Sequence, residues 1–194
     1  MVKTYGHEIE FSSLFFDTLF GLILFFGLDS FLEIKDPVHF LFYLSVSGIV
    51  VYWWLTYKAI DDIFGNEVSD SVTDMIIGLC QIGILNFMLL TSKTFDYVTV
   101  TYLLAILFMT DLVWAILWKY AGKWKTKSRI RREKMELYLS RHIRLDAAMV
   151  VVSVLLAVSS FYINTAVFVA AFIVLNAGEM YTAAKLKFMS IDIF

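Results

Sequence analysis

The sequence predicts an all-α, polytopic integral membrane protein with six transmembrane helices, and three observations lead to this prediction. Hydrophobic residues make up 60% of the 194-residue chain and charged residues only 18%, which is not the balance of a soluble domain. The apolar residues gather into six runs of about 20 residues, the length of α-helix that crosses about 30 Å of hydrocarbon. Ten of the sixteen Lys and Arg residues fall in one link between runs, a pattern typical of loops that set membrane topology.

The first three runs form the predicted helices 10–33, 39–60 and 71–92. The first contains the phenylalanine-rich stretch SSLFFDTLFGLILFFGL, and the third contains MIIGLCQIGILNFMLL. The second, FLFYLSVSGIVVYWWL, ends in Tyr and Trp side chains, which favour a membrane interface. Short links separate these runs, one around Pro37 and the other with the sequence DDIFGNEVSD.

The last three runs form the predicted helices 96–120, 144–163 and 165–187, and all six helices belong to one domain, 1–194. Only Asn164 and Thr165 separate the fifth and sixth runs, so we expect a tight helical hairpin there. Residues 119–144 contain ten basic side chains and are predicted as a basic loop.

The basic loop predicts the orientation of the chain. Short loops rich in Lys and Arg stay on the cytoplasmic side, which places both termini in the cytoplasm. The N-terminal run has no small-residue cleavage site and contains Asp17, so we expect a retained helix and not a signal peptide. The expected location is the plasma membrane of the cell.

Four carboxylates lie within the predicted helices, in the cytoplasmic half of the bilayer when depth is counted at about 1.5 Å per residue. They are Asp17, Asp111, Asp146 and Glu179. An acid at such a depth costs about 2.5 to 3.5 kcal/mol on insertion scales and is a functional candidate by default. We expect Asp17, Asp111 and Glu179 to line an ion pathway that attracts or exchanges cations, with Asn176 on the same face as Glu179.

Other polar positions are candidates for a buried hydrogen-bonded network that joins helices. They are Asp146, Lys58, Gln81 and Asn86. An acid paired with Lys58 or Arg144, or a polar side chain that links two helices, explains such sites without any transport. The same structural explanation stays open for Asp17.

The sequence contains no motif that indicates an enzyme. GxSxG, a glycine-rich phosphate loop, HExxH and paired CxxC are all absent, so we expect neither enzymatic activity nor a cofactor. His7, His39 and His142 are scattered at the ends of predicted helices and include no pair at metal-ligand spacing. We therefore expect interfacial histidines and no metal site.

The basic loop also predicts contact with lipid. Arg129, Arg131 and Arg132 are the expected contacts to anionic headgroups, whereas a nucleic-acid partner is not expected in a membrane loop. The bilayer is the main predicted partner. Monovalent cations and further copies of the chain, in a homo-oligomer, are the other candidates.

Two halves of the chain resemble each other weakly. Asp17 followed by LFGLILF resembles Asp111 followed by LVWAILW, and ILN at 84–86 resembles VLN at 174–176. With three helices in each half, such an echo is typical of an inverted repeat of the kind that transporters use.

Three stretches resemble the six-helix potassium channels without a P-loop that occur in endolysosomes and prokaryotes, whose signature is Phe-Ser-Asp on the first helix. They are Phe15-Phe16-Asp17, FYLSVSGIVVYWW and TYLLAILFMTDLVWAILWKYA. The resemblance implies an oligomer, usually a tetramer, whose first helix lines a central pore. It implies that Asp17 marks the intracellular part of that helix and that Leu22 is the apolar residue that narrows the pore.

The low-temperature-requirement A family of membrane proteins is similar to nearly the same degree. Its Leu-Phe-Phe-Asp signature corresponds to LFFD at Leu14–Asp17, and its aromatic-rich second helix to YWWLTYKAIDD. Both resemblances centre on Asp17.

The sequence thus predicts a membrane cation channel or cation transport protein, with potassium as the candidate ion. One alternative is a proton- or ion-coupled transporter of small solutes, built from the inverted three-helix repeat. The other is a membrane protein without transport activity that binds lipid or a partner through its basic loop.

Overall fold

The computed structural model describes residues 5–28, 33–64, 72–121 and 129–191, and the side chains of 14–25, 27, 33–58, 73–120, 132–133 and 135–185. These ranges contain six α-helices: α1 Tyr5–Leu28, α2 Pro37–Phe64, α3 Val72–Ser92, α4 Tyr97–Ala121, α5 Arg129–Ser159 and α6 Thr165–Ile191. The prediction of an all-α, six-helix chain is confirmed.

Five of the helices contain segments long and apolar enough to cross a membrane. These segments are Pro37–Lys58, Thr73–Ser92, Tyr97–Tyr120, Met135–Ser159 and Thr165–Lys185. In α1 the described apolar segment is shorter, Leu14–Phe25. The chain is therefore a polytopic integral membrane protein.

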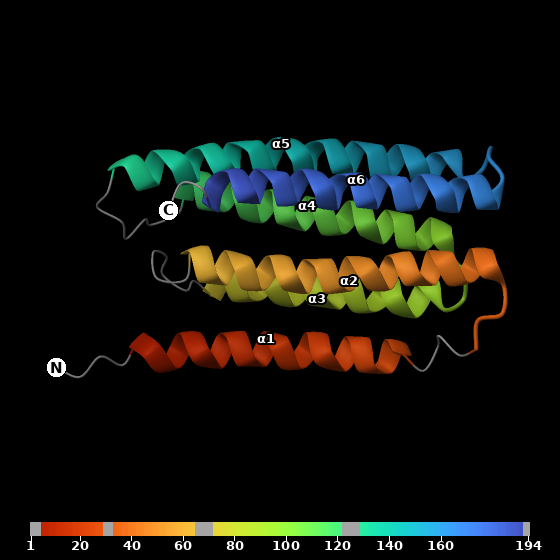
Figure 1. The fold of residues 1–194 in the computed structure, drawn as a ribbon, viewed down its shortest axis with the longest axis horizontal. Helices are drawn as coiled ribbons and strands as arrows, with labels where there is room; N and C mark the ends of the chain where they lie inside the picture. Colours follow the sequence, from red (N-terminus) through yellow and green to blue (C-terminus); the bar gives the residue numbers. More distant parts are fainter. Residues whose placement is uncertain (1–4, 29–32, 65–71, 122–128, 192–194) are drawn as a thin grey trace.

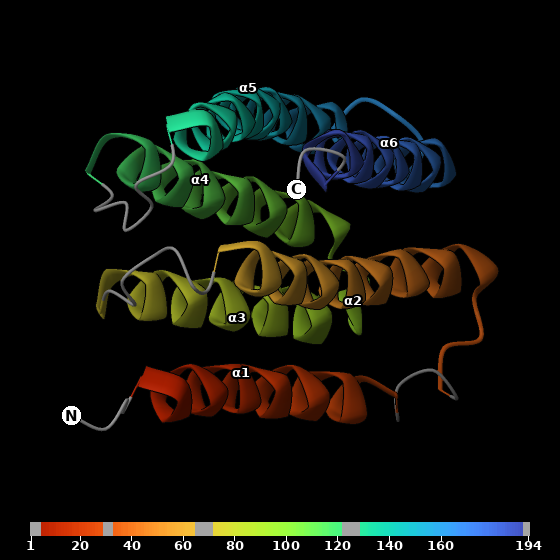
Figure 2. The same cartoon turned by 60° about the vertical axis from the view of Figure 1, so that its left-hand side comes forward.

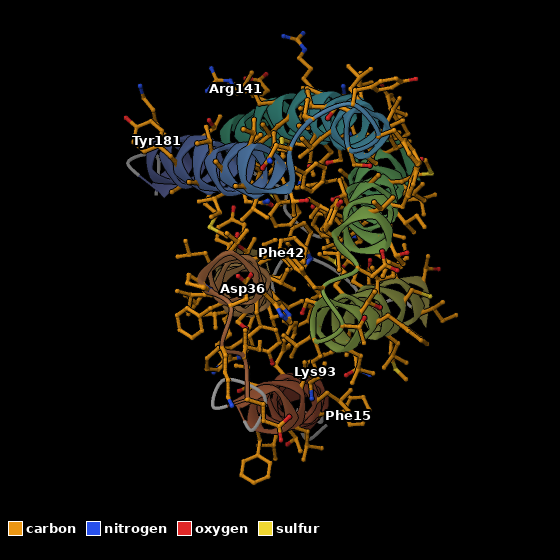
Figure 3. The ribbon with its side chains drawn as sticks, turned by 90° about the vertical axis from the view of Figure 1, so that its right-hand side faces the viewer. Phe15, Asp36, Phe42, Lys93, Arg141 and Tyr181 are labelled. Carbon is orange, nitrogen blue, oxygen red and sulfur yellow. The ribbon has the colours of Figure 1, made fainter. Side chains whose placement is uncertain are left out.

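The six helices lie side by side along one direction (Figure 1). α1 forms one edge, α2 and α3 lie next to it, and α4, α5 and α6 form the opposite side, as the turned view confirms (Figure 2). In a view along the bundle axis, the Phe42 side chain points into the interior, whereas Arg141 and Tyr181 point outward (Figure 3). One end of the bundle contains the start of α1, the end of α4, the start of α5 and the end of α6. That arrangement accords with two termini on one side of a membrane, and which side is cytoplasmic stays a prediction.

Three helices begin at the opposite end of the bundle with the same kind of cap. The Asp36 carboxylate accepts a hydrogen bond from the backbone N–H of His39 at 2.7 Å, at the start of α2. Asp96 accepts one from the N–H of Thr99 at 3.0 Å, and Asn164 accepts one from that of Ala166 at 2.8 Å. Each cap satisfies a backbone donor that the first helical turn leaves without a partner, so α2, α4 and α6 have defined starts.

The predicted basic loop 119–144 is wrong in its second half, because α5 begins at Arg129 and continues without a break into the membrane. Met135, Leu139, His142 and Asp146 are all buried. Their spacing of three or four residues places them on one face of a helix, which packs against α4. Burial of this face explains why a segment so rich in charge is helical.

The connection between the last two helices is longer than the two residues predicted, although α5 and α6 still pack as neighbours. α5 ends at Ser159, and residues 160–164 connect it to α6. The hydroxyl groups of Ser159 and Ser160 donate hydrogen bonds to the carbonyls of Leu156 and Ala157, at 2.7 and 2.6 Å. These bonds satisfy carbonyls of the last turn, which stabilises an earlier end of the helix than the apolar pattern predicts.

The interior between the layers is filled by aromatic and aliphatic side chains. Those that are fully buried include Phe20, Phe42, Tyr43, Leu85, Met88, Leu104, Leu107, Phe108, Phe168 and Phe172. α1 joins this core closely, because the Tyr43 hydroxyl donates to the carbonyl of Gly27 at 2.5 Å and Phe16 packs on Gly78. Toward the end of the bundle where the chain starts, polar side chains replace this apolar filling.

Candidate functional site

A central cluster of three ionisable side chains lies between α4 and α5. Asp111 comes from α4, and His142 and Asp146 lie one turn apart on the same face of α5. The His142 Nε2 atom is 3.0 Å from Asp111 Oδ2 and 3.5 Å from Asp146 Oδ2. One imidazole nitrogen thus faces two carboxylates from two helices.

The central cluster lies deep in the bundle. The side chains of Asp111, His142 and Asp146 are only 15%, 10% and 2% exposed. Asp111 is about 15 Å from the end of α4 at Ala121 and about 21 Å from its start at Tyr97, at 1.5 Å per residue. Asp111 therefore lies within the membrane-crossing segment of α4, nearer the end of the bundle at which the chain starts.

Polar side chains from three further helices surround the central cluster. Gln81 of α3 donates a hydrogen bond from Nε2 to Asp111 Oδ1 at 3.2 Å. Tyr52 of α2 donates its hydroxyl to Glu179 of α6 at 3.3 Å. Glu179 is buried and close enough to interact electrostatically with His142 and Asp111. Five helices therefore contribute polar groups to one interior region.

Aromatic rings fix the orientation of His142. Tyr138 stacks on its imidazole with ring centroids 5.7 Å apart and planes at 12°. Trp114 of α4 approaches the same imidazole edge-on at 6.4 Å. These contacts leave the ring little freedom, so Nε2 stays directed at the carboxylates.

Two buried polar atoms of α5 have no hydrogen-bond partner among the described residues. They are Asp146 Oδ2 and Ser153 Oγ, which belong to residues that are 1% and 0% exposed. The 3.5 Å approach of His142 to Asp146 is a charge contact without hydrogen-bond geometry. A buried carboxylate oxygen without a partner costs free energy, so this position is suited to a ligand.

Asp17 does not join the central cluster, although the sequence predicted that it lies with Asp111 and Glu179. Its carboxylate accepts a hydrogen bond from Trp54 Nε1 at 2.7 Å and pairs with Lys58 Nζ at 2.8 Å. Lys58 also lies over the Trp54 ring, 5.3 Å from its centroid. We call this group the α1–α2 pair. The acid–Lys58 pairing that the sequence left open is therefore present at Asp17, and Lys58 is half-exposed and not buried.

The remaining predicted pathway and network residues have separate positions. Leu22 is on α1 and is 46% exposed. Asn176 is buried and donates its Nδ2 to the Phe172 carbonyl of its own helix, and Asn86 is half-buried on α3. Asp146 pairs with His142, whereas Arg144 is exposed. The structure thus brings together Asp111, Asp146, Glu179 and Gln81 but not Asp17 or Leu22.

The three arginines predicted to contact lipid headgroups lie in the first turns of α5, not in a loop. Arg132 is exposed and forms an ion pair with Glu136 one turn later at 3.1 Å. The side chains of Arg129 and Arg131 lie outside the described residues.

His142 is the functional candidate that the sequence did not predict, and the expectation of an interfacial histidine is wrong for it. It is buried because α5 extends to Arg129, which moves residue 142 from a helix end to a helix interior. The spacing of His142 and Asp146, four residues apart, was the available signal, since it places both on one helical face. The expectation of no metal site rested on the absence of a histidine pair at metal-ligand spacing, and it stays a prediction.

A second acid outside the central cluster links α3 to α4. Asp74 Oδ1 accepts hydrogen bonds from Trp114 Nε1 at 3.2 Å and Trp118 Nε1 at 2.6 Å. Because the Trp114 ring also lies against His142, the contact with Asp74 helps to hold this ring in place beside the imidazole.

No family model, curated protein or solved structure matches this chain. What the molecule does must therefore be inferred from the geometry of its interior.

Proposed function

We propose that the chain transports cations across the membrane and that the cation passes through the central cluster and Glu179. The observation that supports this proposal most directly is that α4, α5 and α6 each bring a largely buried carboxylate to one interior region, where His142 lies between two of them, Asp111 and Asp146. Polar groups from α2, α3, α4, α5 and α6 line this region, so the pathway would lie inside a single chain.

The charges of this region favour a mobile cation. Asp111, Asp146 and Glu179 can supply three negative charges, and His142 can neutralise at most one of them. In a low-dielectric interior an excess of buried negative charge is costly, unless a cation or protons balance it. Helix association alone could be achieved by uncharged amides such as Gln81 at much lower cost.

Flux into liposomes tests the proposal. Purified protein is reconstituted, and entry of potassium, sodium, protons and manganese is followed with ion-sensitive dyes under imposed gradients. Asp111→Asn and Glu179→Gln should each reduce flux about tenfold or more, because each removes a buried charge from the pathway. Glu136→Gln changes a half-exposed acid on α5 outside the central cluster, so it is the matched control and should leave flux unchanged. Absence of flux for all four ions above empty liposomes would show that the proposal is wrong.

A second candidate, the oligomeric potassium channel lined by its first helix, is favoured by the position of α1. This helix forms an edge of the bundle, and Leu14, Leu22 and Phe25 on it are exposed (Figure 1). Such a face could line an axis shared by several chains. In that case Leu22→Ala would increase potassium flux and Asp111→Asn would leave it unchanged. The purified protein would also be a tetramer, by mass measurement in detergent.

A further inference from the structure

We propose that Asp111, His142 and Asp146 bind one divalent first-row transition-metal ion, with zinc, manganese and cobalt as representative members of the class. The proposal rests on the proposed function and deepens it, because it names the kind of cation that the central cluster takes. It requires only side chains of a single chain, from two helices that pack against each other along much of their length.

The separations of the two carboxylate oxygens from the imidazole nitrogen match those in a metal site. Asp111 Oδ2 and Asp146 Oδ2 lie 3.0 and 3.5 Å from His142 Nε2, and one ligand atom from each residue lies within 4.8 Å of the others. Ligand atoms bound at about 2.0 to 2.2 Å are about 3.0 to 3.5 Å apart around an octahedral or tetrahedral ion. An ion could therefore be accommodated with small side-chain rotations.

The unpartnered oxygen of Asp146 points to a ligand independently of these distances. Oδ2 of this nearly inaccessible side chain has no hydrogen-bond partner among the described residues, yet it is directed toward His142. A bound cation would satisfy it. Asparagine at this position would be a better helix-joining residue, since its amide can donate as well as accept.

The groups around the ligands would hold them in position. Gln81 donates to Asp111 Oδ1, so the other oxygen, Oδ2, can turn toward the ion. Tyr138 and Trp114 fix the imidazole plane. Such outer contacts orient ligands and typically change metal affinity about 10- to 100-fold when they are removed.

The donor set selects the class of ion. One imidazole nitrogen with two carboxylate oxygens suits zinc, manganese, iron or cobalt, whereas calcium and magnesium prefer oxygen ligands alone. Two carboxylates also balance the charge of a divalent ion within the membrane. Potassium and sodium gain little from an imidazole nitrogen, so the cluster should discriminate against them.

Metal binding is measured directly on the purified, tag-free protein in detergent. Titration calorimetry with zinc and absorption spectroscopy with cobalt should both show one ion bound per chain, and equal concentrations of magnesium or calcium should not displace it. Pulsed electron paramagnetic resonance with manganese, on protein containing ¹⁵N-histidine, should show coupling to one histidine nitrogen. This spectroscopic result needs no variant, so it tests the site even if ligand variants fail to fold.

Matched variants locate the ion. His142→Gln and Asp146→Asn should weaken zinc binding about 100-fold or more, because each removes a side chain that binds the ion directly. Gln81→Leu should weaken it about 10- to 100-fold. The double variant His7→Gln/His39→Gln removes the other two histidines and should bind zinc as the native protein does. Binding that is lost in this double variant and kept in His142→Gln would overturn the proposal.

The failure of this inference and that of the proposed function give different results. Potassium, sodium or proton flux that depends on Asp111, in a protein that binds no zinc, manganese or cobalt, overturns the metal site and supports cation transport. One bound zinc ion that depends on His142 supports the metal site. If the same protein shows no flux of any ion, the site is structural and the transport proposal is wrong.

Discussion

Two helix pairs of this molecule each join an acid to a base, and they do so in different surroundings. In the α1–α2 pair, Asp17 meets Lys58, which lies over the ring of Trp54 one turn earlier. In the central cluster, Asp111 of α4 meets His142 of α5, which stacks on Tyr138, also one turn earlier. In each half, an acid on the first helix therefore contacts a basic side chain on the second helix, and an aromatic residue lies one turn before that basic side chain.

The two sites differ chiefly in their exposure. The side chains of Lys58 and Asp17 are 44% and 29% exposed, whereas those of the central cluster are 15% or less. Lys58 also carries a charge suited to a single acid, while His142 faces two acids and Glu179 lies nearby. The same arrangement is thus a partly exposed pair of one acid and one base in one half and a largely buried group of two acids and one imidazole in the other.

The inverted repeat stays a prediction, and the two sites add one observation to it. The weak sequence echo between Asp17 and Asp111 is accompanied by equivalent pairing partners on α2 and α5. If the halves share an origin, then only the second half contains an imidazole that faces two acids. The α1–α2 pair then serves as an internal reference for the experiments that follow.

Replacement of His142 by leucine should have the largest effect on stability. It leaves Asp111 and Asp146 buried without the imidazole, and removal of one partner of a buried ion pair costs about 3 to 5 kcal/mol of unfolding free energy. Denaturant unfolding in detergent, followed by circular dichroism, measures the change. A loss below about 1 kcal/mol would show that the imidazole does not stabilise these acids and would remove the contrast with the α1–α2 pair.

Removal of a hydrogen-bond donor should have an intermediate effect that differs between the two sites. Gln81→Leu takes a donor from Asp111, whose side chain is only 15% exposed, and should cost about 1 to 3 kcal/mol, because little water can replace the donor. Trp54→Phe takes a donor from the partly exposed Asp17 and should cost less through the lost hydrogen bond, since water can take its place. The same unfolding measurement compares them. If the two variants lost the same unfolding free energy, burial would not set the strength of these hydrogen bonds.

Replacement of Lys58 by methionine should have the smallest effect. The pair with Asp17 is partly exposed, and such pairs contribute about 0 to 1 kcal/mol. Its contribution should also fall in 1 M salt, where the screening length is about 3 Å. Unfolding of native and Lys58→Met protein at low and high salt measures this. A loss comparable to that of His142→Leu would show that Asp17 is also an essential buried charge.

Much of the fold was predictable from the sequence because membrane insertion is governed by local composition. Long runs of apolar residues, such as the one that contains TYLLAILFMT, predict membrane-crossing helices. The ends of α5 were not predictable in this way. Its charged first turns are held as helix by the burial of Met135 and Leu139 against other helices, and such contacts have no signature in hydropathy.

The candidate site was predictable only in part. Asp111, Asp146 and Glu179 were identified because an acid in an apolar run is unusual, and Gln81 because it is polar in such a run. Their common depth was predicted, but the separation of Asp17 from them was not. His142 was missed because its depth depends on where α5 begins.

By itself, the sequence determined the class of the protein, the number of its helices and the identity of the acids that enter the membrane. Those properties depend on the composition and periodicity of single segments. Only the tertiary structure decided that Asp111 faces His142 and Asp146 while Asp17 faces Lys58. The rotation and register of one helix against another are set by packing and hydrogen bonds between segments far apart in the chain, and no single segment contains that information.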